Sequence, residues 1–287
     1  MFIDVHVHPA FFEAINGDDR RTECRHQALG IHRNGKASLE HIFNQMACAG
    51  LDQVCLLPED YSSTAGGAVV TNDEIRSLVD LAPDRFIGFA SVDPMAPGCC
   101  DELERAFSEL SLRGLKLHPG RQAFYPHDER LNSIYAICER YDRPIIFHSG
   151  LSWEPDSLSK YSRPLEFEEV AYGHPKLRIC LAHFGWPWVD ETAMIMCKFG
   201  NVYADTALLY FDTAIEFYTR VFTHDLARTW IDRSLRHQVM FGSNSPRFEQ
   251  MRMAEALAKL GLRDSTIELI RGTNAQAFIG GKSDGCV

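Results

Sequence analysis

The chain has 287 residues, of which 45% are hydrophobic and 24% are charged, and its formal net charge is −10. This length suits either one large α/β barrel or two ordinary domains. No linker or low-complexity segment divides the sequence, so we expect a single domain over residues 1–287. Nucleic acids and anionic membrane surfaces are bound by clustered Lys and Arg, so the acidic balance argues against both kinds of partner.

The cysteines indicate a reducing compartment. There are nine, an odd number, and none forms a C-x-x-C motif. Most lie in apolar segments such as 47–49 and 179–181, which predicts buried free thiols rather than disulfides. The first residues lack a basic leader segment and no apolar run approaches 18 residues, so we expect a cytoplasmic protein.

Strand patterns alternate with helix patterns along the whole chain. Apolar runs predict strands over residues 1–8, 52–57, 85–91, 114–118, 144–148, 177–182, 201–205 and 238–242. Amphipathic patterns predict helices over 38–49, 72–82, 100–112, 128–142, 164–173, 187–199, 207–236, 247–260 and 264–279. Eight such strands at this length predict a TIM (β/α)8 barrel. An open doubly wound sheet would need a Gly-rich phosphate loop after the first strand, and there is none.

Several predicted strands end in residues that can bind metal or move protons. His6 and His8 end the first strand, and residues two apart project from one face, so both rings can share one ion. In a parallel barrel all strand carboxyl ends meet at the active-site face. We therefore expect one cluster there, made of His6, His8, His118, His148, His183, Asp205 and Asn244.

Taken together, the runs 4–9, 114–119, 147–150, 181–185, 240–246 and 274–275 resemble the amidohydrolase superfamily. The resemblance is to its amidohydrolase-related branch, which contains both decarboxylases and lactone hydrolases. It implies that His6, His8 and His148 bind a divalent metal, most often zinc, with manganese as the alternative. It also implies that His183 is catalytic and that Asn244 stands where an aspartate is usual.

Asn244 leaves two interpretations of the site open. A neutral amide can offer its oxygen to a metal but cannot accept a proton from bound water. Three neutral histidines and an amide leave the ion's full charge in place, which favours deprotonation of that water with His183 as the acceptor. Otherwise the site binds its ligand without turnover.

Further residues are candidates for substrate recognition. Lys116 could hold a substrate carboxylate, pair with Asp205, or be carbamylated to bridge two metals, and we favour the first two roles. The other candidates are His118, Arg121, Tyr125 and Arg247. Trp153, Trp186 and Trp188 could wall an apolar pocket. The loop 9–37, with Arg20, Arg21, Arg25, His26, His32 and Arg33, is the expected lid.

The sequence thus predicts a metal-dependent hydrolase that acts on a small carboxylated or cyclic ester or amide through metal-activated water. The alternative within enzymes is non-oxidative decarboxylation of an aromatic or enoic acid. A binding protein that has lost catalysis is the competing interpretation, because of Asn244. We expect a small-molecule substrate, and a homodimer is compatible with the sequence.

Overall fold

The computed structural model describes residues 1–31, 34–152, 154–207, 209 and 211–280. Eight parallel strands form its centre: β1 (Ile3–Val7), β2 (Gln53–Leu56), β5 (Phe86–Gly88), β6 (Leu115–Leu117), β7 (Ile145–Phe147), β8 (Ile179–Leu181), β9 (Val202–Asp205) and β10 (Val239–Met240). They pair in two runs, β1-β2-β5 and β10-β9-β8-β7-β6. The N–H of Val5 donates to the carbonyl of Phe241, and the N–H of Ala90 donates to the carbonyl of Gly114, at 2.9 and 2.7 Å. These bonds join both edges, so the strands close into the predicted barrel.

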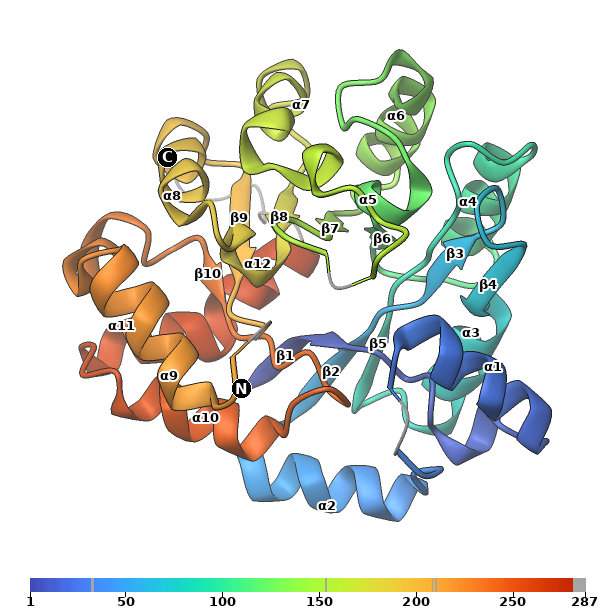
Figure 1. Cartoon of the computed structure of the whole chain (residues 1–287), viewed down its shortest axis with the longest axis horizontal. Helices are drawn as coiled ribbons and strands as arrows, with labels where there is room; N and C mark the ends of the chain where they lie inside the picture. Colours follow the sequence, from blue (N-terminus) through green and yellow to red (C-terminus); the bar gives the residue numbers. More distant parts are fainter. Residues whose placement is uncertain (32–33, 153, 208, 210, 281–287) are drawn as a thin grey trace.

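Helices form an outer ring around the strands (Figure 1). They are α1 (Asp19–Leu29), α2 (Leu39–Ala49), α3 (Asn72–Leu81), α4 (Cys99–Ser108), α5 (Pro119–Gln122), α6 (Asn132–Arg140), α7 (Glu168–Gly173), α8 (Val189–Lys198), α9 (Ala214–Thr219), α10 (Gln250–Lys259) and α11 (Asp264–Glu268). A further helix, α12 (Asn274–Gly280), lies inside this ring, behind the strands in Figure 1. The Ser38 side chain caps α2, which the sequence predicts over 38–49, by accepting the N–H of His41.

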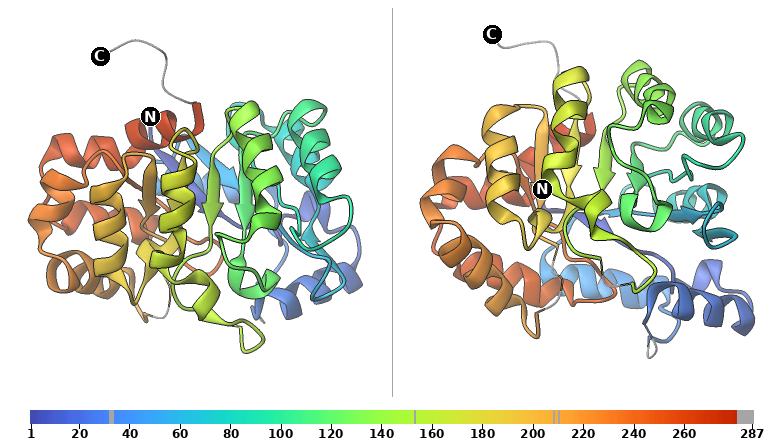
Figure 2. Two further views of the ribbon diagram at one scale, coloured as in Figure 1. Left: turned by 90° about the horizontal axis from the view of Figure 1, so that it is seen from above. Right: turned by 45° about the horizontal axis from the view of Figure 1, so that its top comes forward.

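The hydrophobic core has two layers. One fills the barrel interior and includes Val5, Cys55, Ile146 and Met240, together with Phe278 of α12. The other lies between the strands and the helices. In the side view, α12 and the N-terminus lie at the same end of the barrel (Figure 2). That end is therefore packed shut, and the opposite end, where the strands finish, is free for a site.

Three predicted elements differ in the structure, and one hairpin is additional. The prediction of one helix over 207–236 is wrong. Helix α9 begins only after Thr213, whose side chain caps it. Two π-helical segments follow, at Arg220–Asp225 and Trp230–Ser234. The region 264–279 is likewise divided into α11, a π-helical turn and α12. An antiparallel hairpin of β3 (Glu59–Tyr61) and β4 (Gly67–Val70) follows β2 and was not predicted. The expected loop 9–37 contains α1.

The cysteines agree with the sequence only in part. All eight within the described residues are free, but only Cys55, Cys138 and Cys180 are buried, whereas Cys24, Cys48 and Cys197 are exposed. The exposed thiols lie on outward faces of helices, which apolar neighbours in sequence do not reveal. Cys286, Trp153, His32 and Arg33 lie outside the described residues. No helix in the described part of the chain combines the length and hydropathy needed to span a bilayer.

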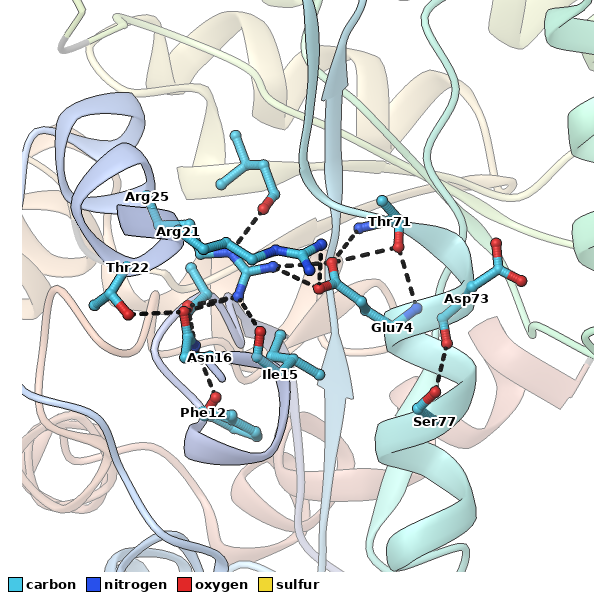
Figure 3. A network of polar contacts seen from close by, with 12 residues as sticks. Phe12, Ile15, Asn16, Arg21, Thr22, Arg25, Thr71, Asp73, Glu74 and Ser77 are labelled. Carbon is cyan, nitrogen blue, oxygen red and sulfur yellow. Dashed lines mark hydrogen bonds and ion pairs between the residues drawn. The ribbon is translucent and has the colours of Figure 1, made fainter. Parts of the chain in front are cut away.

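Arg25 fixes α1 to the rest of the molecule (Figure 3). Only 2% of this residue is exposed. Its guanidinium donates to the carbonyls of Ile15 and Val69 and to the Asn16 side chain at 2.8–2.9 Å. It also pairs with both carboxylate oxygens of Glu74, at 2.8 and 2.9 Å. The segment expected to be a lid is therefore anchored to the β3–β4 hairpin and to α3.

This network predicts unequal effects for two arginines that share Glu74. Arg25→Met should lower the free energy of unfolding by about 3 kcal/mol, because it leaves the buried carbonyl of Ile15 and the partly buried carbonyl of Val69 without this donor and removes the buried partner of Glu74. Arg21→Met is the matched control. Arg21 also contacts Glu74 but its side chain is 49% exposed, so its loss should cost under about 1 kcal/mol. Urea denaturation measures both, and equal losses would contradict the anchoring role.

Candidate active site

His6 and His8, at the end of β1, face each other across 3.2 Å between their Nε2 atoms. The other nitrogen of each ring faces a carboxylate. His6 Nδ1 lies 2.8 Å from Asp205 Oδ2, and His8 Nδ1 lies 4.0 Å from Glu59 Oε1. The carboxylate of Asp205 holds the ring proton of His6 on Nδ1, so Nε2 of His6 presents a bare lone pair toward His8. Glu59 is too distant for a hydrogen bond to His8, but its charge attracts a proton to the Nδ1 side of that ring.

His148 and His183 make a second pair with the same arrangement. His183 Nε2 lies 3.2 Å from His148 Nδ1. The outer nitrogens contact carbonyl oxygens, His183 Nδ1 that of Ala207 at 3.3 Å and His148 Nε2 that of Leu151 at 3.2 Å. Since a carbonyl only accepts, the ring proton of each histidine lies on the outer nitrogen. The two inner nitrogens are again bare and close together.

The two pairs adjoin, because the ring centroids of His6 and His183 are 4.8 Å apart. Within the described part of the chain, one group of three could share an ion on distance alone: His6, His183 and Asp205, whose ligand atoms lie within 4.8 Å of one another. Two imidazole nitrogens on one tetrahedral zinc are about 3.4 Å apart, because each Zn–N bond is about 2.0–2.1 Å. Both observed nitrogen pairs therefore have the spacing of ligands to a cation.

Burial keeps the clustered histidines neutral. It lowers the pKa of His8 to about 4 and that of His148 to about 3. Burial, aided by neighbouring positive charges, also lowers the pKa values of His6, His118 and His183 well below the ordinary value. Neutral imidazole is the form that binds metal.

The loop after β10 is fixed against β1. Asp4 accepts the hydroxyl and the N–H of Ser243, at 2.6 and 3.0 Å, and the side-chain amide of Gln250 at 2.9 Å. Asn244 follows, its N–H bonded to the carbonyl of His6 at 3.0 Å. Gly242 allows this approach, since a Cβ there would lie 3.0 Å from that of His6. Asn244 thus lines the same cavity as the histidines.

Two candidate residues have a left-handed backbone. The φ angle is 60° at His183 and 63° at Asn244. Such angles are uncommon outside glycine and cost free energy, and they concentrate at functional sites.

Lys116 and His118 complete the floor of the cavity from β6 and its end. Lys116 is 1% exposed, and its ammonium makes no hydrogen bond or ion pair with the residues that the structure describes. Burial lowers its pKa, while the charges of Glu59 and Asp205 oppose the shift. His118 stacks on His148, with ring centroids 3.9 Å apart. The ammonium of Lys116 therefore lies at the cavity with N–H groups that no described residue accepts.

Arg247 and Glu154 close the cavity from above. Arg247 donates to the carbonyl of Leu29 at 2.5 Å, and lies 3.4 Å from Glu154 Oε1. The enclosed volume is about 30 Å³. The end of α1 and the loops that carry Glu154 and Arg247 therefore meet at this guanidinium.

The remaining candidates lie elsewhere. Arg121 donates to the carbonyl of Ala28 at 2.9 Å and its guanidinium lies over the ring of Tyr61. Tyr125 packs on His127 and Tyr161. Trp186 packs on Phe211, and Trp188 lies beside Arg163. None of these predicted residues lines the histidine cavity.

Sequence reasoning missed Glu59 and Glu154, which line the cavity. Glu59 follows the second predicted strand, so the rule that found the histidines could have found it. The charges of His8, Lys116 and Arg121 lower its pKa, against burial, which alone would raise it. Glu154 carries no such signal.

Comparisons with known proteins agree with this description. A family model described as amidohydrolase matches residues 3–281. The 2-amino-3-carboxymuconate-6-semialdehyde decarboxylase of Dictyostelium discoideum is 28% identical over 131 residues, which cover 40% of this chain but only 36% of that relative.

Two solved structures show the same fold. An uncharacterised TIM-barrel protein from Bordetella bronchiseptica superposes with a TM-score of 0.74 at 22% identity, covering 97% of this chain and 98% of that one. A 5-carboxyvanillate decarboxylase variant from Novosphingobium aromaticivorans, with one aspartate changed to asparagine, holds manganese and 3-methoxy-4-hydroxy-5-nitrobenzoic acid. It superposes with a TM-score of 0.67 at 17% identity, covering 98% and 97%.

The buried histidines predict that the metal-free protein loses stability as pH falls below about 6.5. The unfolded chain then takes up protons that the folded protein does not, at about 1.4 kcal/mol per pH unit for each such histidine. Asp4 and Asp205 act in the opposite sense, because burial raises both pKa values to about 6 and the folded state binds their protons first. Five histidines, among them His118, destabilise the fold on acidification, and two carboxyls stabilise it. The net effect is therefore a lower free energy of unfolding at acidic pH.

Urea denaturation at pH 7 and pH 5 tests this. His118→Asn should lose less stability than the wild type between the two values, whereas the exposed control His41→Asn should match the wild type. Equal stability of the wild type at both pH values would contradict neutral histidines in the fold.

Proposed function

Because the chain belongs to the amidohydrolase family, we propose that it is a metal-dependent decarboxylase that removes carbon dioxide from an aromatic or enoic carboxylic acid. The curated relative named above is a decarboxylase, which supports this alternative over the hydrolase that the sequence favoured. The fold by itself does not choose between them.

One observation carries the proposal: four imidazole nitrogens, paired at 3.2 Å, adjoin one small cavity, which Lys116 also lines with an ammonium that has no hydrogen-bond partner among the described residues. The nitrogens suit a divalent cation, and the cation together with Lys116 gives the cavity a strong preference for an anion. A carboxylate is the anion that every substrate of a decarboxylase carries.

The donor types suit a divalent metal, although the group that already meets the spacing on distance alone is His6, His183 and Asp205, so His148 would have to draw nearer to His6 and His8. His6 and His8 would hold it through Nε2 and His148 through Nδ1, since the other nitrogen of each ring faces an oxygen. Asn244 can add its amide oxygen. When bound, the ion supplies positive charge that orients the substrate and stabilises negative charge developing beside the carboxylate. Imidazole donors favour zinc over manganese.

Asn244 is compatible with decarboxylation and less so with hydrolysis. Hydrolysis consumes water, which a base must deprotonate, and because an amide is no base that task would fall to His183. Decarboxylation breaks the bond between the carboxylate and its neighbouring carbon, releases carbon dioxide and places one proton on that carbon. It therefore needs a proton donor but no activated water.

His183 is the residue we assign to that proton. Its Nδ1 is held by the carbonyl of Ala207, which directs Nε2 toward the cavity. An anionic substrate beside the ring favours protonation of Nε2, from which the proton passes to carbon. Lys116 holds the carboxylate through its ammonium.

The first test concerns the metal. Protein purified without chelator should contain roughly one equivalent of a divalent ion, as the ligand count requires. His6→Ala and His148→Ala should each lower that content strongly, because each removes a ligand. His127→Ala, at a partly exposed ring paired with Glu166, is the control and should retain it. Elemental analysis gives the content and the element. Full metal retention in both ligand variants would refute the site.

The second test concerns the reaction. Carbon dioxide release should be followed with 5-carboxyvanillate, salicylate and an acyclic enoic acid. His183→Asn should lower turnover by about 10²–10⁴-fold with metal content unchanged. Lys116→Met should mainly raise KM, because it removes a cation that binds the carboxylate. Release of alcohol or amine from esters or amides, with no carbon dioxide from any acid, would make the protein a hydrolase.

A third comparison addresses Asn244. Asn244→Asp adds an anionic ligand and should tighten metal binding, as measured by competition with a chelator. If the wild type turns over none of the acids and Asn244→Asp does, then the function is binding and not catalysis.

A further inference from the structure

The cavity at the histidines is too small for an acid substrate. Its volume of about 30 Å³ has room for no more than a few water molecules. Ligand pockets commonly measure about 300–1,000 Å³. The body of any aromatic acid must therefore lie outside it.

A second cavity of about 730 Å³ adjoins the first. It lies between α2, the residues before α2, and the loop between β10 and α10. Phe11, Phe12 and Phe248 give it apolar walls, and Asn44 and Gln45 of α2 add polar groups. Its volume is in the range of a small-molecule pocket.

Two residues line both cavities, His8 and Arg247, so they form the partition between them. Arg247 is held in that position by the carbonyl of Leu29 and by Glu154. The Glu154 contact is long, at 3.4 Å, for a guanidinium and a carboxylate. Both side chains are largely shielded from water, 18% and 14% exposed.

The carboxylate of Glu154 thus lies in the cavity that contains Lys116 and Arg247. A carboxylate brought by a substrate would find the same cations. When a substrate carboxylate enters, it would replace the carboxylate of Glu154 beside Arg247, so the guanidinium would not be left buried without an anionic partner. Once Glu154 leaves, the histidine cavity enlarges and joins its neighbour at the partition.

We propose that the 730 Å³ cavity is the chamber for the substrate body, and that Glu154 occupies the carboxylate position until the substrate displaces it. The substrate class is an acid whose carboxylate lies between Lys116 and Arg247. Its aryl body, with polar substituents at the far end, extends past His8 to the phenylalanines. This inference rests on the proposed function for the identity of the anion.

The test introduces a large side chain at positions that line the chamber but not the histidine cavity. Cys48 lines it from α2, so Cys48→Trp adds an indole at the wall of the chamber on a different element from His8. Cys197→Trp makes the same change at an exposed cysteine of α8, which does not line the chamber. Gln45→Trp fills the chamber from a second position, in case Cys48→Trp fails to fold.

Calorimetric titrations with acetate, benzoate and biphenyl-4-carboxylate measure binding to protein purified without chelator. In Cys48→Trp the Kd of biphenyl-4-carboxylate should rise by at least ~10-fold, while that of acetate stays unchanged. Cys197→Trp should bind all three acids as the wild type does. Glu154→Gln should tighten the binding of all three several-fold, because the competing anion is removed.

Identical binding of biphenyl-4-carboxylate to the wild type, Cys48→Trp and Gln45→Trp would overturn the chamber, as would a wild type that binds none of the acids. Weaker binding in Glu154→Gln would overturn the displacement. The proposed function fails separately. If the acids bind as predicted and no carbon dioxide appears, the chamber stands without decarboxylation. If carbon dioxide is released with the same KM in Cys48→Trp, the decarboxylase stands without the chamber.

Discussion

A neutral imidazole has one proton for two nitrogens, and in this site oxygen atoms hold that proton on the outer side of each ring. Asp205, Ala207 and Leu151 provide oxygens at 2.8–3.3 Å, and Glu59 provides a more distant one. The inner lone pairs then face each other in two pairs, each 3.2 Å apart. Opposed lone pairs repel, so with these tautomers the arrangement is stabilised by positive charge between the nitrogens.

The barrel supplies the rigidity that this arrangement needs. Asp4 ties the loop after β10 to β1 through Ser243 and Gln250, so the first and last strands of the chain bring His6 and Asn244 together. Asp205 acts on two histidines at once, because one oxygen accepts from the His6 ring and the other from the N–H of His183. A carboxylate behind the ligands thereby sets both the tautomer and the position of the rings. Arg25 performs a comparable task for α1, which reaches the cavity with Leu29.

The sequence predicts the barrel and the convergent histidines because buried parallel strands are continuous apolar runs whose ends share one face. It does not predict the hairpin, since Glu59, Asp60 and Tyr61 lack an apolar alternation and pair only with a neighbouring segment. Arg121 shows that the position of a side chain in a loop cannot be predicted in this way. Its position depends on a carbonyl of α1, which is distant in sequence.

Glu154 was missed for the same reason, because its position over the cavity depends on the path of a loop. The choice between hydrolase and decarboxylase was also beyond the sequence, because the same histidines and metal can serve either reaction.

The tautomers of the four histidines test the central claim most directly. Two-bond proton–nitrogen correlation spectra of metal-free protein, labelled with ¹⁵N in histidine, report which nitrogen of each ring carries the proton. At pH 7 we predict the proton on Nδ1 of His6, His8 and His183 and on Nε2 of His148, with the inner nitrogens of the ligands shifting when Zn²⁺ is added. Protons on the Nε2 atoms of His6 and His8, or doubly protonated rings at that pH, would contradict the account.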